Sequence, residues 1–458
     1  MKKDFISAEI YRQNKHWNDP AVFFSELKSI RHARKLFEEI IPYLGKRQIL
    51  SIIGLRRTGK TVLLKQLMQE LLIEKTPTSV LFLTFDEAIM PNNSSLADYL
   101  NVYLDTIAPK NGPLFVFFDE IQYNAKWQHV LKRYYDTDSR IKFIVSGSSS
   151  LFLKKKTTES LAGRIYEFSL SVLSFEEYLE LKDVRKELLD GYRKIAVPMT
   201  LRFDPSPFRE AFFLRHGIEM EREFERYIRY GQFPEIIKEN DPAVIRKYLT
   251  DAIYKKTIEY DIPKIFGVEK IDELKFLFQV LVNEIGSIVE TGNIAREIGL
   301  DEKTVKKYLN YFEESFLIYL IYNFTRSARK SRRLGKKIYL GSPNFFSAFH
   351  EWPDENQSEH VIGFLAENYC FSLLRKTYQH VSFRRIRKDE VDFLATNNIS
   401  DTRGYRYIEV KYREQPSADM FAFANKLSKK SGTRLLVVTK NAFTERDDMI
   451  FIPAWMLS

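Results

Sequence analysis

Gly54-Leu55-Arg56-Arg57-Thr58-Gly59-Lys60-Thr61 is the stretch of sequence that decides the fold of the N-terminal part of this chain. It lies between an apolar run at 48–53 and a run typical of a helix at 62–72. Backbone N–H groups of such a glycine-containing loop wrap a phosphate, and the start of the following helix adds the positive end of its dipole. The pattern therefore predicts a nucleotide site. The expected binding residues are Gly54, Leu55, Arg56, Arg57, Thr58, Gly59, Lys60, Thr61 and Val62.

Two carboxylates follow an unbroken apolar strand at 114–118. We expect Thr61 and Asp119 to bind Mg²⁺ and Lys60 to reach the β- and γ-phosphate oxygens. Glu120 is then placed to polarise the water that attacks the γ-phosphate. The alternative is a buried strand that ends in a solvated Asp-Glu turn, which fits less well with an intact phosphate loop upstream. The pair predicts ATP hydrolysis in addition to ATP binding.

Further apolar runs at 79–85 and 142–146 alternate with helical segments. This alternation predicts an α/β fold with a parallel, doubly wound sheet, as in P-loop NTPases of the RecA and AAA type. A strand inserted between the phosphate loop and the acidic strand is the arrangement of ATPases with an additional catalytic glutamate. Ser146, at the end of the later run, either senses the γ-phosphate and orients water or is an ordinary turn serine.

The composition is that of a large globular chain. Its 458 residues, of which 44% are hydrophobic, are enough for several packed cores. No apolar stretch approaches the length of a membrane span, and residues 1–5 lack the apolar core of a signal peptide. A single cysteine, Cys370, rules out an internal disulfide and argues against a cysteine-built zinc site. We expect a cytoplasmic protein that contacts no membrane.

The formal net charge of +10 is unevenly distributed. Residues 323–340 contain seven basic side chains and no acidic one, and 384–388 hold a second basic cluster. Such blocks either neutralise phosphates along a nucleic-acid backbone or are solvated loops that bind nothing. The charge alone leaves both interpretations open.

The segment 293–312 has the pattern of a helix-turn-helix, with Gly299 at the bend and Val305, Leu309 and Phe312 on one face. The basic segment after it, with the flanking apolar strands, predicts the wing of a winged helix. This module either binds DNA, which we expect more than RNA, or packs against the ATPase or a neighbouring subunit. The residues expected to contact nucleic acid are Lys303, Thr304, Lys306, Lys307, Arg329, Lys330, Arg332 and Arg333.

A second candidate active site lies in the last third of the chain. Glu409 and Lys411 are two residues apart on a predicted strand and therefore share a face. We expect Asp392 and Glu409 to bind Mg²⁺, Lys411 to activate water, and Glu367 to complete the outer metal shell. The alternative is a set of exposed charges on an amphipathic hairpin.

The chain resembles the archaeal and bacterial AAA-type P-loop ATPases that carry a C-terminal domain of unknown function, DUF4143. Its C-terminal part is also similar to PD-(D/E)XK nucleases of the Holliday-junction resolvase type. The motifs that carry the resemblance, in chain order, are the loop with Arg56-Arg57, Phe118-Asp119-Glu120-Ile121-Gln122, Gly147-Ser148-Ser149, Leu161-Ala162-Gly163-Arg164, Leu173-Ser174-Phe175-Glu176-Glu177, Gly231-Gln232-Phe233-Pro234-Glu235, Glu390-Val391-Asp392 and Glu409-Val410-Lys411.

The resemblance implies ATP at 54–61, Mg²⁺ at Thr61 and Asp119, and water activation by Glu120. It also implies that Arg164 is an arginine finger, acting in its own chain or on a neighbour's γ-phosphate, unless it forms a structural salt bridge. A homo-oligomer and a protein partner are both compatible with it.

Four domains are therefore expected: a P-loop AAA-type ATPase at 1–178, a helical region at 179–275, a winged helix-turn-helix at 276–345, and a restriction-endonuclease-like α/β domain at 346–458. ATP hydrolysis would then act as a switch on DNA binding, or on metal-dependent DNA cleavage by the last domain. The alternative is a signalling or assembly ATPase whose C-terminal half binds protein partners.

Overall fold

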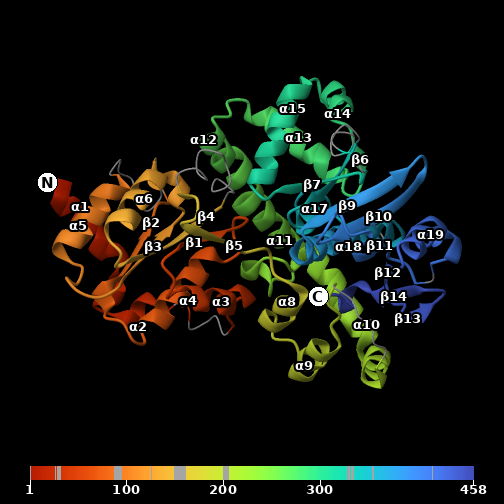
Figure 1. Ribbon diagram of the computed structural model, residues 1–458, viewed down its shortest axis with the longest axis horizontal. Coiled ribbons are helices and arrows are strands. Elements are labelled where there is room, and N and C mark those ends of the chain that lie inside the picture. Colours follow the sequence, from red (N-terminus) through yellow and green to blue (C-terminus); the bar gives the residue numbers. More distant parts are fainter. Residues whose placement is uncertain are drawn as a thin grey trace. The chain divides into compact units, whose positions relative to one another are not determined.

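The computed structural model describes the chain except for residues 1, 26, 28–31, 87–94, 125, 149–160, 200–205, 326, 328–330, 332–334, 353–354 and 415. It divides into two compact units (Figure 1). The N-terminal unit comprises Met1–Ser171 with Glu314–Phe316, and the C-terminal unit comprises Val172–Glu313 and Leu317–Ser458. Each unit is described separately below.

The N-terminal unit is built on a five-stranded sheet in the order β2-β3-β4-β1-β5. All neighbouring strands are parallel, and β4 lies between the strand before the phosphate loop and the acidic strand, as expected. The predicted α/β class is therefore confirmed. The strands are β1 (Ile49–Ile53), β2 (Val80–Thr84), β3 (Leu114–Asp119), β4 (Ile141–Gly147) and β5 (Ile165–Ser169).

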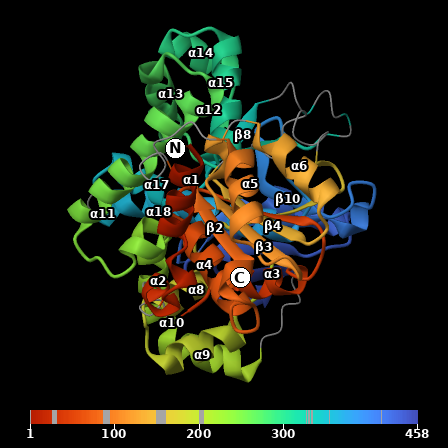
Figure 2. The same ribbon diagram turned by 90° about the vertical axis from the view of Figure 1, so that its left-hand side faces the viewer.

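Helices cover both faces of this sheet (Figure 2). On one face, α4 buries Leu63, Leu64 and Leu67 against apolar side chains of β1, β2, β3 and β4. These central strands are almost fully buried, which explains why they read as continuous apolar runs. The helices around the sheet are α3 (Lys35–Ile40), α4 (Lys60–Leu71), α5 (Leu96–Thr106) and α6 (Trp127–Thr137).

The N-terminal helix α1 (Lys2–Gln13) leads into a segment that covers the open edge of β2. Asn14 both donates to and accepts from the backbone of Phe82, and Gln13 accepts from the Thr84 N–H. His16 Nε2 and Trp17 Nε1 both lie within hydrogen-bond distance of the Val80 carbonyl oxygen. Side chains thus satisfy backbone groups that an edge strand otherwise exposes.

The C-terminal unit begins with a helical region, as expected. Helix α10 (Pro207–Tyr230) is capped at its C-terminus by Gly231. There Asn344 Nδ2 donates to the carbonyls of Tyr227 and Ile228, and Asn344 Oδ1 accepts from the Gln232 N–H. This buried network accounts for the Gly231-Gln232 motif in structural terms. The helices are α8 (Phe175–Leu181), α9 (Lys186–Ile195), α10 (Pro207–Tyr230), α11 (Pro242–Tyr248), a π-helical segment (Leu249–Asp261) and α12 (Ile262–Phe266).

Three helices and a small antiparallel sheet follow, with strand order β6-β8-β7. Gly299, at φ 72°, makes the turn between α14 and α15. This is the element order of a winged helix. The elements are α13 (Ile271–Asn283), β6 (Ile288–Val289), α14 (Thr291–Ile298), α15 (Glu302–Glu314), β7 (Ile318–Tyr322) and β8 (Lys336–Leu340).

The rest of the C-terminal unit holds a six-stranded mixed sheet in the order β13-β14-β12-β11-β10-β9. β9, β10 and β11 are antiparallel neighbours, whereas β11, β12 and β14 are parallel. No helix among the described residues is long and apolar enough to cross a bilayer. The elements are α17 (Asn344–Phe349), α18 (Glu355–Thr377), β9 (His380–Ile386), β10 (Asp389–Thr396), β11 (Arg406–Lys411), α19 (Ala422–Lys430), β12 (Leu435–Thr439), β13 (Thr444–Arg446) and β14 (Met449–Pro453).

Candidate functional site

The phosphate loop leaves the C-terminal end of β1 and enters α4. Gly54 is fixed by sterics, because a Cβ at this position would lie 2.2 Å from the Leu170 carbonyl oxygen. Gly59, at φ 96°, adopts the left-handed conformation that glycine allows without strain. The two glycines therefore meet separate requirements of the same loop.

Lys60 is 4% exposed and folds back over the loop. Its Nζ lies 3.1 Å from both the Gly54 and the Leu55 carbonyl oxygens. Arg34 supports the loop from outside, donating to the Thr58 carbonyl at 2.6 Å. The lysine ammonium is thus held inside the loop by neutral acceptors, which phosphate oxygens can replace with stronger, charge-assisted hydrogen bonds.

Asp119 is the buried centre of the site, at 2% exposure. Thr61 Oγ1 donates to Asp119 Oδ2 at 2.7 Å, and Ser146 Oγ donates to Oδ1. Burial and the neighbouring Glu120 raise the pKa of Asp119, while the two hydroxyl donors act in the opposite direction. The oxygens of Thr61 and Asp119 suit Mg²⁺, which prefers hard oxygen ligands.

Glu120 follows Asp119 in a left-handed conformation, at φ 51°. This turn directs it away from the strand, and its backbone N–H lies 3.4 Å from Ser146 Oγ. Gln122 Nε2 donates to Glu120 Oε2 at 2.5 Å and to Ser148 Oγ at 3.1 Å. Gln122 ends the motif Phe118–Gln122, and the sequence alone predicts no role for its side chain. The structure places it beside the candidate base.

The remaining loop residues take different positions. Leu55 and Thr58 are buried, Arg57 is exposed at φ 65°, and Arg56 and Val62 are partly buried. Thr58 Oγ1 donates to the Leu55 carbonyl at 2.9 Å and so closes the loop internally.

Arg164 does not lie near the phosphate loop. Its backbone carbonyl accepts from the Ile49 N–H, at the N-terminal end of β1, whereas the loop leaves the opposite end of that strand. Its guanidinium pairs with Asp136, with Nε and Oδ1 2.9 Å apart. This placement corrects the expectation of an arginine finger within its own chain and agrees with the alternative of a salt bridge.

Four of the eight candidates for nucleic-acid contact, Lys303, Thr304, Lys306 and Lys307, lie on α15. Lys303, Lys306 and Lys307 are exposed. Lys306 pairs with Glu302 at 2.6 Å, and the Thr304 N–H donates to Asp301 at 2.9 Å as a helix cap. The other four candidates, Arg329, Lys330, Arg332 and Arg333, lie outside the described residues.

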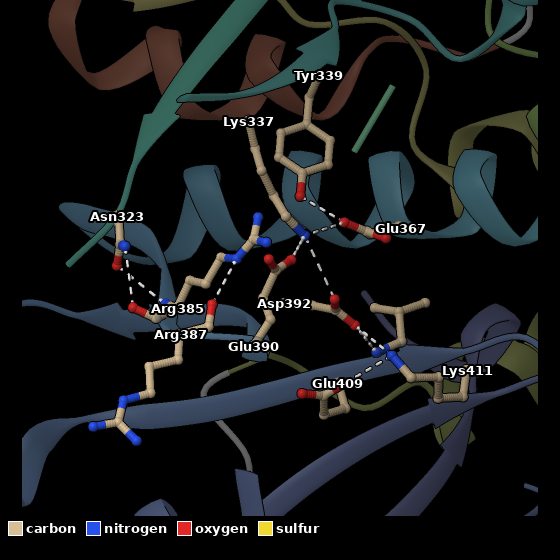
Figure 3. A network of polar contacts seen from close by, with 11 residues as sticks. Asn323, Lys337, Tyr339, Glu367, Arg385, Arg387, Glu390, Asp392, Glu409 and Lys411 are labelled. Carbon is tan, nitrogen blue, oxygen red and sulfur yellow. Dashed lines mark hydrogen bonds and ion pairs between the residues drawn. The ribbon is translucent and has the colours of Figure 1, made fainter. Parts of the chain in front are cut away.

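The second charged cluster brings three of its four expected members into direct contact (Figure 3). Lys411 Nζ lies 3.0 Å from Asp392 Oδ2 and 2.7 Å from Glu409 Oε2. The fourth member, Glu367 on α18, is linked to Asp392 through Lys337. In the sequence, Lys337 is one of the seven basic residues of 323–340, for which phosphate binding and a solvated loop were both open. Lys337 is instead 2% exposed.

Asp392 and Glu409 are the residues expected to bind Mg²⁺ in this cluster. Their carboxylates are paired with lysine, and no group of three or more potential ligands suited to a metal ion occurs among the described residues. Burial alone would raise the pKa of Asp392, but the ammonium groups of Lys337 and Lys411 hold it below its ordinary value. Burial and the Asp392 charge raise the pKa of Glu409.

Three family models match the chain. Residues 46–179 match an AAA domain, 221–356 a domain of unknown function (DUF8612), and 362–457 a domain of unknown function (DUF4143). An uncharacterized protein of Methanocaldococcus jannaschii is 26% identical over 74% of this chain and 68% of its own length. Another, from Haemophilus influenzae, is 22% identical over 94% of this chain and 99% of its own length.

Among solved structures, the Aeropyrum pernix Orc1 protein in complex with DNA is 12% identical, with a TM-score of 0.30 over 76% of this chain and 93% of that one. The C. elegans PCH-2 structure is 15% identical, with a TM-score of 0.27 over 52% of this chain and 64% of that one. The family models and the loop geometry together support an AAA-type, ATP-binding and ATP-hydrolysing domain followed by a DUF4143 domain.

Proposed function

We propose that this protein hydrolyses ATP at the phosphate loop and uses the bound nucleotide as a switch on nucleic acid, DNA more than RNA, bound by the C-terminal unit. The observation that carries the first half is the hydrogen-bonded chain from Thr61 through Asp119 to Ser146, with Glu120 at its end. It joins the loop, the acidic strand and the inserted strand in one polar network, as γ-phosphate hydrolysis needs.

In this proposal Lys60 binds the β- and γ-phosphates, and Thr61 and Asp119 hold Mg²⁺. The ion, when bound, neutralises phosphate charge. Glu120 accepts a proton from the attacking water, and Gln122 holds its carboxylate in place through the 2.5 Å hydrogen bond. Ser146 contacts both Asp119 and the Glu120 N–H, so a hydrogen bond from its hydroxyl to the γ-phosphate would change the contacts at the end of β3.

Nucleic acid is proposed to contact α15 and the β9–β10 hairpin. Exposed lysines line the α15 surface, and the hairpin tip carries Arg385, Arg387 and Lys388, all exposed. Basic side chains on exposed elements are the feature that binds a phosphate backbone. DNA cleavage is not included in this proposal, because the carboxylates of the C-terminal cluster are paired with lysines.

The test is ATP turnover with and without duplex DNA, for the parent protein and for Lys60→Ala. We expect turnover that DNA accelerates and that the variant lacks. Turnover retained in Lys60→Ala would exclude the phosphate loop as the hydrolytic site. An ATP turnover rate that neither DNA nor RNA changes would exclude the nucleic-acid half of the proposal.

A second candidate is an assembly ATPase whose C-terminal unit binds protein. The observation that favours it is that some basic side chains of the winged-helix segment are already paired or buried within the chain. Lys306 pairs with Glu302, and Lys337 is buried. Turnover indifferent to nucleic acid, with oligomerisation that depends on a partner protein, would support this candidate over the first.

A further inference from the structure

We propose that the ammonium of Lys337 takes the place of a divalent cation in the carboxylate cluster of the C-terminal unit, so that this cluster binds no metal ion and instead fastens the winged-helix sheet to the mixed sheet. The inference concerns residues that the proposed ATPase does not use.

Lys337 is surrounded by three carboxylates from two elements. Its Nζ lies 2.8 Å from Glu390 Oε1, 3.2 Å from Glu367 Oε1 and 3.5 Å from Asp392 Oδ1. A lysine ammonium has three N–H donors, and three oxygens surround it here. Glu367 comes from α18 and the other two from β10, so one cation joins a helix, a strand of the mixed sheet and its own strand β8 (Figure 3).

The carboxylate oxygens that face the centre of the cluster already have partners. Asp392 Oδ1 faces Lys337, while Oδ2 accepts from Lys411 at 3.0 Å and from the Val410 N–H at 2.9 Å. Tyr339, which shares the buried face of β8 with Lys337, donates to Glu367 Oε1 at 2.7 Å. A metal ion has no position there unless a lysine leaves.

Charge explains why a cation is needed. Asp392, Glu409 and Lys337 are each 8% exposed or less, and an unpaired buried carboxylate is strongly unfavourable. A divalent cation and a lysine ammonium are alternative solutions to the same problem. Because lysine is covalently part of β8, this solution also holds the small sheet in place.

A second link between the two sheets lies close to the first. Asn323, just after β7, donates through Nδ2 to the Arg385 carbonyl at 3.2 Å and accepts from the Arg385 N–H at 3.1 Å. The Phe324 N–H donates to the Phe383 carbonyl at 2.7 Å. Both strands of the wing are thus bound to the mixed sheet, β7 by the segment that follows it and β8 by the lysine.

The test is the binding of Mn²⁺ to the nucleotide-free full-length chain. Binding is measured as the decrease in the electron paramagnetic resonance signal of the free ion. All proteins carry Asp119→Asn, which removes the carboxylate expected to hold a divalent cation at the phosphate loop. We expect no Mn²⁺ bound with Lys337 present and about one ion per chain in Lys337→Met, since carboxylate oxygens that lose their lysine partner are typical ligands of divalent cations. Adding Asp392→Asn should abolish the new binding. The matched control, Lys336→Met, changes the neighbouring lysine on the opposite face of β8 and should bind none.

Two results would overturn the proposal. One is a folded Lys337→Met protein, checked by circular dichroism, that binds no Mn²⁺. The other is Mn²⁺ binding with Lys337 present that disappears in Asp392→Asn, a comparison that decides the question even if Lys337→Met does not fold. ATP turnover of the same chains with Asp119 restored tests the nucleotide site separately.

Discussion

Gly54 is the residue at which the phosphate loop accepts no side chain. Substitution by alanine would place a methyl group 2.2 Å from the Leu170 carbonyl oxygen, a backbone atom that cannot simply rotate away. We predict that Gly54→Ala lowers ATP affinity at least tenfold, because the loop must shift to relieve the overlap. The measurement is the binding of a fluorescent ATP analogue.

Gly45→Ala is the matched control for this change. A Cβ at Gly45 meets nothing within 4 Å, and no positive φ is involved. We expect its ATP affinity to equal that of the parent chain. Equal affinity in Gly54→Ala as well would show that the loop is wider than the structure indicates.

His16 makes the stability of the N-terminal unit depend on pH. It is fully buried, its Nε2 faces the Val80 carbonyl, and burial lowers its pKa to about 4. The ordinary value is about 6.5, so the unfolded chain binds a proton more readily than the folded one. Stability is therefore complete above pH 6.5 and is lost as the pH falls toward 4. From pH 7 to pH 5 the loss is about 2 kcal/mol.

Urea unfolding at the two pH values tests this prediction. His16→Gln should lower stability at pH 7 and remove this part of the pH dependence. The control His129→Gln, on the exposed side of α6, should have the same pH dependence of stability as the parent chain. An unchanged pH dependence in His16→Gln would assign the effect to other groups.

At the scale of elements, the β9–β10 hairpin carries exposed basic residues at its tip. Ile386 pairs with Asp389, so Arg387 and Lys388 form a two-residue turn, and Arg387 adopts φ 59°. We predict that Arg387→Ser with Lys388→Ser weakens DNA binding for all sequences alike. The slope of log affinity against log salt should fall by about 1 for each phosphate that the hairpin no longer neutralises.

Fluorescence anisotropy with labelled duplexes at several salt concentrations measures this slope. Lys186→Ser, on the exposed side of α9 in the same unit, is a control that removes a basic side chain away from the hairpin. If the hairpin variant and the control have the same slope as the parent chain, the hairpin is a solvated turn.

The elements also differ in how far the sequence could predict them. The phosphate loop and Asp119-Glu120 are contiguous patterns, so their positions at the ends of β1 and β3 followed from local sequence. Lys337 did not. It stands beside Lys336 in a basic segment, and alternate residues of a strand face opposite sides, so only the pairing of β8 decides which lysine is buried.

Arg164 shows a similar limit. Its motif gives the order of residues along the chain but not the end of the sheet to which they belong. That end is set by the parallel pairing of β5 with β1, in which Ile165 lies opposite Ile49. Long-range pairing of this kind cannot be inferred from local periodicity.

At the scale of the whole molecule, the chain separates nucleotide chemistry from basic surfaces. The Thr61–Asp119–Ser146 network belongs to the N-terminal unit, and α15, the basic hairpin and the Lys337 cluster belong to the C-terminal unit. A switch requires that nucleotide and DNA each change the affinity of the other by the same factor. ATP affinity measured with and without DNA should therefore change as much as DNA affinity does with and without ATP.

The central claim is that the phosphate loop hydrolyses ATP with Glu120 as the base. Phosphate release at saturating ATP and Mg²⁺ by the parent chain and by Glu120→Gln tests it most directly, because the substitution keeps the size of the side chain and removes its charge. We predict retained ATP binding and a turnover lowered by about 10²-fold or more. Equal turnover in the two proteins, or no turnover in the parent chain, would contradict it.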